Sequence, residues 1–287
     1  MHTLSADVDG LTVESTYEPA ELPVHGYPLL VLLHGGGYTS EYFKVAGSQA
    51  GSFVDIANRS GFDVLRIDRP GYGRSTRLAD EVNTYAHQAE ILARAVASAI
   101  GDEDRPVFLV GHSIGGMISL ELAARQLDWC LVGLSVSGMG AQLSDSGLGE
   151  QLGAIPGSGL AELPAELRRQ IFYGPEATVS ADVVEAAGIC YAPAPIVELR
   201  AAARWAFERL DEVAAAVTAP VHHALGEYDS LWDVSEAALA AFTSRFRPEV
   251  SIRPELIRRA GHSIDHHRVG ATLHHRQLGF AHRCAVT

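Results

Sequence analysis

The feature that most constrains the fold is a serine between an apolar run and a helical pattern. Residues 107–110 are all apolar, residues 111–115 read Gly-His-Ser-Ile-Gly, and residues 117–124 have helical spacing. This pattern predicts a nucleophile elbow, a sharp strand-to-helix turn in which a Cβ at either glycine would collide with a neighbouring strand or helix. We expect the Ser113 hydroxyl to stand above a sheet, at a helix N-terminus that favours developing negative charge.

Short apolar runs alternate with helical patterns through the chain. Unbroken apolar runs are typical of strands buried on both faces, and their alternation with helices predicts parallel strands joined by right-handed crossovers. The sequence therefore predicts an α/β fold. The predicted strands are residues 28–33, 62–67, 107–110, 130–136 and 221–225, and the predicted helices include residues 49–60 and 84–100.

A long connection interrupts this alternation. Residues 140–219 lie between two predicted strands and combine Gly and Pro punctuation with several helical stretches. So long a connection within a compact sheet is more typical of a lid than of a structureless loop. We expect residues 1–139 and 220–287 to form the core domain and residues 140–219 to form a helical cap.

Composition limits the partners and the compartment. The chain has 22 Lys and Arg against 35 Asp and Glu, a formal net charge of −13, which argues against nucleic acid or an anionic membrane surface as a partner. Cys130, Cys190 and Cys284 are far apart and match no metal-binding spacing, so we expect a reducing, cytoplasmic location. The N-terminus has no signal-peptide pattern. The sequence also contains no run of about 18 apolar residues, the length that a helix needs to cross a membrane.

A glycine run at residues 35–37 directly follows a buried strand. Glycines let backbone N–H groups approach a ligand oxygen, and the residue after a nucleophile contributes a second N–H. Together with Ile114, this run predicts an oxyanion hole. The alternative is a glycine turn that only lets a strand pack on a helix.

Two later segments carry the other groups that a serine nucleophile needs. Asp229 lies in a turn after a late strand and is the preferred acid, with Asp233 and Glu227 as alternatives; an ordinary N-capping aspartate is the other interpretation. His262 follows the last strand-like segment and is the predicted general base. The chain order is thus serine, aspartate, histidine.

Together these segments resemble the α/β-hydrolase superfamily over nearly the whole core, from residue 29 to the C-terminal helix, but not over the insertion. The matching segments are residues 34–37 (its oxyanion turn), 68–75 (its D-x-P-G-x-G-x-S loop), 111–115 (its elbow), 226–229 (its acid turn) and 261–262 (its histidine loop).

The resemblance implies a mostly parallel eight-stranded sheet flanked by helices, with a helical cap between the sixth and seventh strands. It assigns Gly36 as one oxyanion donor, with Gly37 nearly as favoured, and implies that Arg69, Tyr72 and Ser75 hold the shape of their loop. Superfamily members with alkyl-enzyme chemistry have an aspartate at the nucleophile position, so a serine there favours attack on an acyl carbonyl.

The predicted function is hydrolysis of a carboxylic ester, lactone or thioester of small-molecule size through an acyl-enzyme intermediate, without cofactor or metal. Ser113 is the nucleophile, His262 the base and Asp229 its partner, with Gly36 and Ile114 as oxyanion donors. One alternative is a triad-dependent lyase or tailoring enzyme that performs elimination, C–C cleavage or cyclisation. Another is a non-catalytic ligand-binding receptor on the same fold.

The C-terminal region is rich in histidine. Histidines seven residues apart lie two helical turns apart, too far to share a metal ion, so we expect a polar helix face. Asp265, His266 and His267 follow the expected base closely and are candidates to line the pocket or tune its pKa. His112, within the elbow, is expected to pack beneath the turn. The six histidines are His262, His266, His267, His274, His275 and His282.

Overall fold

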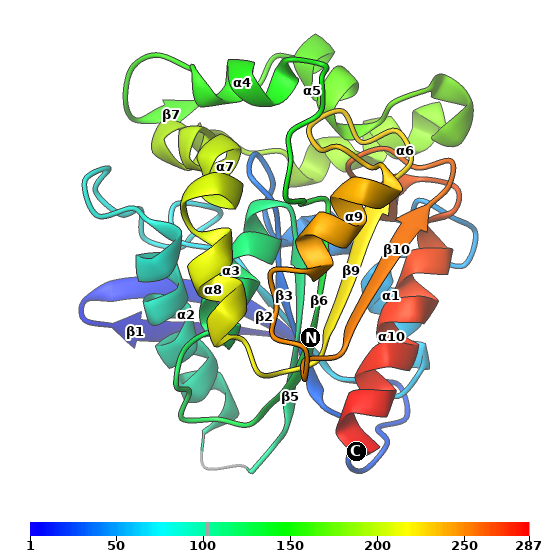
Figure 1. Cartoon of the computed structure of the whole chain (residues 1–287). Helices are drawn as coiled ribbons and strands as arrows, with labels where there is room; N and C mark the ends of the chain where they lie inside the picture. Colours follow the sequence, from blue (N-terminus) through cyan, green and yellow to red (C-terminus); the bar gives the residue numbers. More distant parts are fainter. Residues whose placement is uncertain (102–103, 287) are drawn as a thin grey trace.

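The computed structural model describes residues 1–101 and 104–286 (Figure 1). Its main sheet has eight strands in the order β1-β2-β4-β3-β5-β6-β9-β10. β1 pairs antiparallel with β2, and β2 antiparallel with β4, whereas the remaining neighbours pair in parallel. This confirms the predicted α/β class and its mostly parallel sheet. The strands are β1 (His2–Val8), β2 (Leu11–Glu18), β3 (Leu29–Leu33), β4 (Val64–Ile67), β5 (Val107–His112), β6 (Leu131–Ser137), β9 (Val221–Gly226) and β10 (Ile252–Ile257).

The central strands are apolar on both faces because helices cover both sides of the sheet. In β3 all five side chains are buried, and β5 is buried from end to end. The five predicted strand ranges coincide with β3, β4, β5, β6 and β9, whereas β10 was expected only as an unbounded strand-like segment before His262. The residue pattern did not predict the β1–β2 hairpin. Its residues are partly exposed, so the apolar signal is weak. Asp9 and Gly10 both adopt positive φ at its turn, and an Asp-Gly pair is a hairpin signal that was present in the sequence.

Helices flank the sheet in two layers (Figure 1). α2 and α3 lie with α8 on one face, and α1 and α10 lie on the other. The helix predicted over residues 49–60 begins later, at Phe53, because Ser52 and Asp55 form a capping box at its N-terminus. The core helices are α1 (Phe53–Arg59), α2 (Tyr85–Ile100), α3 (Ile114–Ala123), α9 (Glu236–Thr243) and α10 (Gly270–Val286).

The connection between β6 and β9 is mainly helical. In Figure 1 α4 and α5 lie along the top of the molecule and α6 lies above the arrowheads of β9 and β10, whereas α7 and α8 continue down to contact α3. It comprises α4 (Leu148–Gly153), β7 (Leu160–Ala161), α5 (Ala165–Phe172), α6 (Ala181–Ala186), β8 (Ala194–Pro195), α7 (Ile196–Glu208) and α8 (Leu210–Ala216). Single 3₁₀ turns are η1 (Ser40–Lys44), η2 (Glu176–Thr178), η3 (Ala187–Cys190) and η4 (Ile264–His266).

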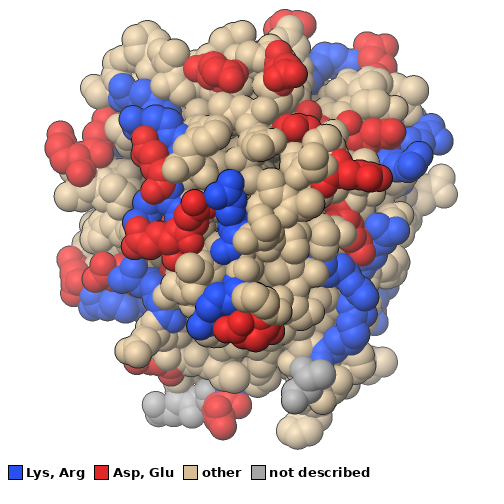
Figure 2. Space-filling view, viewed as in Figure 1, with Lys and Arg blue, Asp and Glu red and all other residues tan. Residues whose placement is uncertain are grey.

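The surface is mixed in charge. Figure 2 shows acidic and basic side chains interspersed over one face of the molecule, without a continuous basic area. Within the described ranges, no helix has both the length and the apolar character needed to span a membrane.

Candidate active site

Ser113 lies at the sharp turn between β5 and α3, as the elbow pattern predicts. Its φ of 52° and ψ of −120° are unusual for a residue with a side chain, so the surrounding structure must hold this geometry. A Cβ built on Gly115 would lie 2.0 Å from the carbonyl oxygen of Leu33, and one on Gly111 would lie 2.5 Å from the carbonyl oxygen of Gly115. The two glycines are therefore required by the close approach of backbone to backbone.

The structure brings Ser113, His262 and Asp229 into one line of contacts. The Ser113 hydroxyl lies 3.0 Å from Nε2 of His262, and Nδ1 of His262 lies 2.8 Å from Oδ2 of Asp229. With Nδ1–H donating to the carboxylate, Nε2 is free to accept the serine proton. His262 and Asp229 are both buried, and Asp229 also accepts the backbone N–H groups of Leu231 and Trp232 through Oδ1. These two backbone hydrogen bonds fix the position of the carboxylate that orients the imidazole.

The two alternative acids have other partners. Oδ1 of Asp233 accepts the backbone N–H of Ser235 just before α9, and Oε2 of Glu227 accepts the N–H of Arg259. Among the three carboxylates of this turn, Asp229 is thus the one hydrogen-bonded to His262.

The glycine turn after β3 packs directly on the elbow. A Cβ built on Gly36 would lie 2.8 Å from Cδ1 of Ile114, and Ile114 is the first residue of α3, where a helix leaves its N–H groups without an intrahelical acceptor. A Cβ built on Gly37 would approach Leu163, Phe172 and Ala192 instead, so Gly36 is the glycine of this pair that packs against the residue after Ser113.

A buried arginine braces this turn. Nε of Arg69 donates to the carbonyl of His34 at 2.8 Å, and Nη2 donates to the carbonyl of Gly35 at 3.3 Å. Arg69 in turn pairs with Glu198 of α7, 3.1 Å away, and neither side chain is exposed. Arg69 therefore links α7 of the helical connection to the backbone of the glycine turn after β3.

Further hydrogen bonds complete the Glu198 site. The carboxylate accepts the Tyr72 hydroxyl at 3.0 Å and the Gln88 amide at 2.6 Å. Ser75 donates to the carbonyl of Asp68 within the same loop at 2.6 Å. The sequence resemblance assigned Arg69, Tyr72 and Ser75 to this loop, but it missed Glu198, since a glutamate in a helix ordinarily indicates a solvated face.

Histidines of the C-terminal region are largely buried, so the expected polar helix face is wrong for His274, although His275 and His282 are exposed. His274 donates to Asp265 at 3.1 Å, and Tyr42 donates to the other oxygen of that carboxylate at 2.8 Å. Burial alone would raise the pKa of Asp265, but its hydrogen bond to His274 and the charge of His274 hold it below the usual range. Asp265 therefore anchors α10 to η1.

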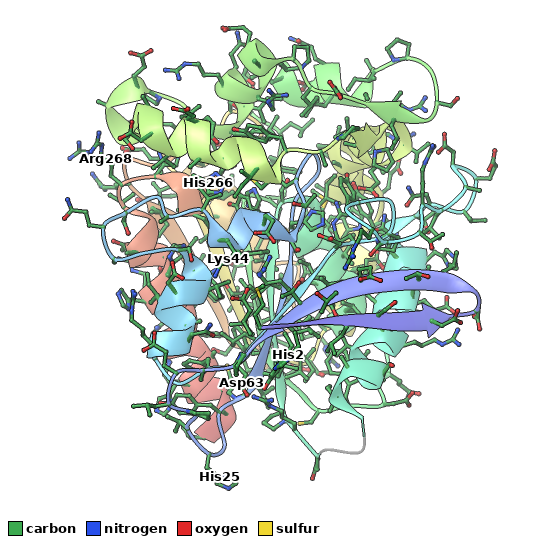
Figure 3. All side chains as sticks on the ribbon, turned by 180° about the vertical axis from the view of Figure 1, so that it is seen from behind. His2, His25, Lys44, Asp63, His266 and Arg268 are labelled. Atoms are coloured by element: carbon green, nitrogen blue, oxygen red, sulfur yellow. The ribbon has the colours of Figure 1, made fainter. Side chains whose placement is uncertain are left out.

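The remaining histidines near the elbow pack against this cluster. His112 stacks on Tyr42 with 4.6 Å between ring centroids and lies 5.0 Å from the His262 ring, so it packs behind the base. His266 donates to the Tyr42 carbonyl, and Figure 3 shows it beneath the overlying helices, at the opposite end of the sheet from Asp63. Across residues 1–101 and 104–286, no three His, Cys, Asp or Glu side chains are grouped to hold a metal ion.

Buried histidines predict a loss of stability in acid. Burial lowers the pKa of His223, His266 and His267 to about 4, so the folded protein keeps them neutral while the unfolded chain takes up protons below about 6.5. Because the unfolded state binds more protons in this window, the free energy of unfolding falls as pH decreases from about 6.5 toward 4. The expected loss is on the order of 2 kcal/mol for each histidine at about pH 5.

Urea unfolding at several pH values measures this effect. His266→Gln is expected to flatten the dependence between about pH 7 and pH 5, whereas His275→Gln, at an exposed position of α10, is expected to leave it unchanged. A free energy of unfolding that does not change over this range would contradict the prediction.

A small apolar cavity of about 20 Å³ adjoins Ser113. This volume is about that of one water molecule, and residues of α4 and α7 form part of the cavity wall. The Phe172 ring, at the end of α5, lies nearly parallel to the His262 ring at 6.4 Å. Besides Ser113, the cavity is lined by Met117, Leu143, Gly149, Leu152, Leu199, Ala202, Ala203, Leu231 and Trp232.

The sheet order, the elbow serine and the serine–histidine–aspartate contacts define a class of α/β proteins with a nucleophile elbow. Comparison with known proteins narrows this class. Residues 30–272 match the model of the alpha/beta hydrolase family, and the chain belongs to that family.

The individual sequence relatives match this chain over less than half of its length and at low sequence identity. Protein phosphatase methylesterase 1 of Mus musculus is 31% identical over 128 residues, which are 45% of this chain and 31% of that protein. Phospholipase YtpA of Bacillus subtilis is 27% identical over 109 residues, 38% of this chain and 39% of that protein. The chain thus matches between 31% and 39% of the length of these curated relatives. A soluble variant of monoglyceride lipase from Saccharomyces cerevisiae shares the fold, with a TM-score of 0.73, 17% identity, and coverage of 98% of this chain and 94% of that one.

Proposed function

We propose that this protein is a serine hydrolase that cleaves a carboxylic ester, lactone or thioester. The observation that carries the proposal is the line of contacts from Ser113 through His262 to Asp229, at 3.0 and 2.8 Å. As Ser113 Oγ attacks the carbonyl carbon, its proton passes to Nε2 of His262, and the Asp229 carboxylate stabilises the imidazolium.

The backbone completes the first half-reaction. The N–H groups of Gly36 and Ile114 donate to the oxyanion of the tetrahedral intermediate, at a helix N-terminus whose dipole also favours the negative charge. Collapse of the intermediate breaks the bond to the leaving alcohol or thiol, which takes the proton from His262. The acyl group then remains on Ser113.

Water completes the second half-reaction. His262 removes a proton from a water molecule, whose oxygen attacks the acyl carbon, and the carboxylic acid leaves as Ser113 recovers its proton. His262 takes part in every proton transfer of this cycle, and its ring nitrogens are in hydrogen-bond contact with Ser113 and Asp229.

The substrate is a small acyl compound. Relatives named as a methylesterase and a phospholipase support an ester, and the cavity at Ser113 is lined mainly by hydrocarbon side chains. Residues 140–219 act as the cap: α4 and α7 contribute Leu152 and Leu199 to the cavity, and a cavity of about 20 Å³ requires these helices to move before an acyl group enters.

Two measurements test the proposal together. A fluorophosphonate probe is expected to add one phosphonyl group to the protein, mapped by peptide mass spectrometry to Ser113. Turnover of short-chain esters in H₂¹⁸O is expected to place one heavy oxygen in the released acid, whereas elimination would release an acid without it. Absence of the adduct, or an unlabelled acid, would overturn the proposal.

A further inference from the structure

Trp232 has a buried indole N–H without an acceptor among the described residues. The side chain is 3% exposed and lies three positions after Asp229 in the turn that follows β9. An indole N–H is a donor only, and a buried donor without a partner costs about 1–3 kcal/mol. This cost is avoided if a bound molecule supplies the acceptor.

The indole forms part of the wall of the cavity that contains Ser113. The described side chains of this wall carry two polar groups, the Ser113 hydroxyl and the Trp232 N–H, and the others are leucine, alanine and methionine side chains or glycine. A Cβ built on Gly140 would lie 3.4 Å from both Cβ and Cε3 of Trp232, so this part of the side chain packs against Gly140. In an indole ring, Nε1 and Cε3 lie on opposite edges, so the N–H is not on the edge that carries Cε3.

The backbone holds the indole in place. Trp232 forms an antiparallel bridge with Leu143, and its backbone N–H donates to Oδ1 of Asp229 at 3.3 Å. On either side of the bridge, Ser144 donates to the carbonyl of Leu231 and Asp233 donates to the carbonyl of Gln142, both at 2.9 Å. A donor fixed in this way is preorganised, so little ordering is needed when it meets an acceptor.

We propose that the Trp232 N–H binds an oxygen in the acyl group of the substrate, so that the preferred esters carry an oxo, hydroxyl or alkoxy oxygen on the acyl chain. This inference rests on the proposed function, because the acyl group is the part that stays on Ser113 through both half-reactions. A purely apolar pocket discriminates weakly between chains, whereas a site built to hydrogen-bond a substrate group disfavours the analogue that lacks it.

A matched pair of phenyl esters tests the inference. Methoxypropanoate and pentanoate have the same chain length and differ by an ether oxygen in place of one CH₂; phenyl levulinate places a keto oxygen on the same chain. After correction for intrinsic hydroxide reactivity, the wild type is expected to favour one of the oxygen-bearing esters by about tenfold in kcat/KM. Trp232→Phe keeps a large aromatic ring without the donor and is expected to abolish this preference, which is measured as the ratio of the kcat/KM values for the two esters within each protein.

A measurement on the unsubstituted tryptophan makes the test independent of how well Trp232→Phe folds. The chain has three tryptophans, and Trp129→Phe and Trp205→Phe assign the other two indole N–H resonances. Methoxypropanoic or levulinic acid is expected to shift the Trp232 indole proton downfield, whereas pentanoic acid is not.

The outcomes separate the inference from the proposed function. If the esters are hydrolysed with an equal preference in wild type and Trp232→Phe, or if no acid shifts the indole proton, the role of Trp232 is refuted while the hydrolase stands. If Ser113 is not labelled and no ester is cleaved, the proposed function fails as well.

Discussion

Exchange of Ser113 for alanine is expected to lower kcat for ester hydrolysis by at least about 10⁴-fold, because the acyl-enzyme no longer forms. The remaining rate would come from the oxyanion donors and substrate binding alone. Steady-state turnover of the best short-chain ester measures the effect, and far-UV circular dichroism verifies that the variant is folded.

A matched serine provides the control. Ser98 lies on the exposed side of α2, outside the site, and Ser98→Ala is expected to keep kcat within about twofold. Because Ser113 and His262 act as one unit, the double variant Ser113→Ala with His262→Ala is expected to be no slower than Ser113→Ala by more than about tenfold. Substantial activity in Ser113→Ala would place the nucleophile elsewhere.

Exchange of Glu198 for alanine is expected to lower the free energy of unfolding by about 3–5 kcal/mol. The variant leaves the Arg69 guanidinium buried without its carboxylate, and the two side chains are fully buried in the wild type. It also releases the arginine that holds the carbonyls of His34 and Gly35, so kcat is expected to fall because the proposed oxyanion donor, the Gly36 N–H, is displaced. Urea unfolding and ester turnover measure the two effects.

The same helix offers the matched control. Glu208 lies at the end of α7 in an exposed pair with Arg204 at 3.8 Å, so Glu208→Ala is expected to change the free energy of unfolding by less than about 1 kcal/mol. Glu198→Gln keeps an acceptor for the Tyr72 hydroxyl and is expected to fall between the two alanine variants. Equal stabilities of Glu198→Ala and Glu208→Ala would show that the buried pair does not brace the turn.

Steric requirements of the backbone explain why part of the candidate site could be predicted from the sequence. A strand-to-helix turn at Ser113 needs Gly111 and Gly115 because the backbone approaches within distances that exclude a Cβ, so these residues recur as a pattern of fixed spacing. At Gly36 the atoms nearest to a built Cβ are side-chain carbons of Ile114 and Leu199, so side chains limit the space there. Each group lies at the carboxyl end of a strand, and parallel strands bring those ends to one edge of the sheet.

Contacts between side chains on different helices and strands could not be predicted from local sequence patterns. Glu198 and Arg69 are 129 positions apart, and each on its own has the appearance of a solvated charge. His274 was expected on a polar face, yet its partner Asp265 draws it into the interior. The hairpin of β1 and β2 was missed because its half-exposed residues give a weak apolar pattern.

The sequence by itself therefore determined the α/β fold, the elbow and the candidate serine, aspartate and histidine, because steric limits on glycine and strand burial act locally. Only the tertiary structure decided which carboxylate contacts His262, how Glu198 pairs with the arginine that holds the glycine turn, and that Trp232 lines the cavity beside Ser113. These depend on distances between segments remote in the chain, which burial and hydrogen bonding select only when the whole core has packed.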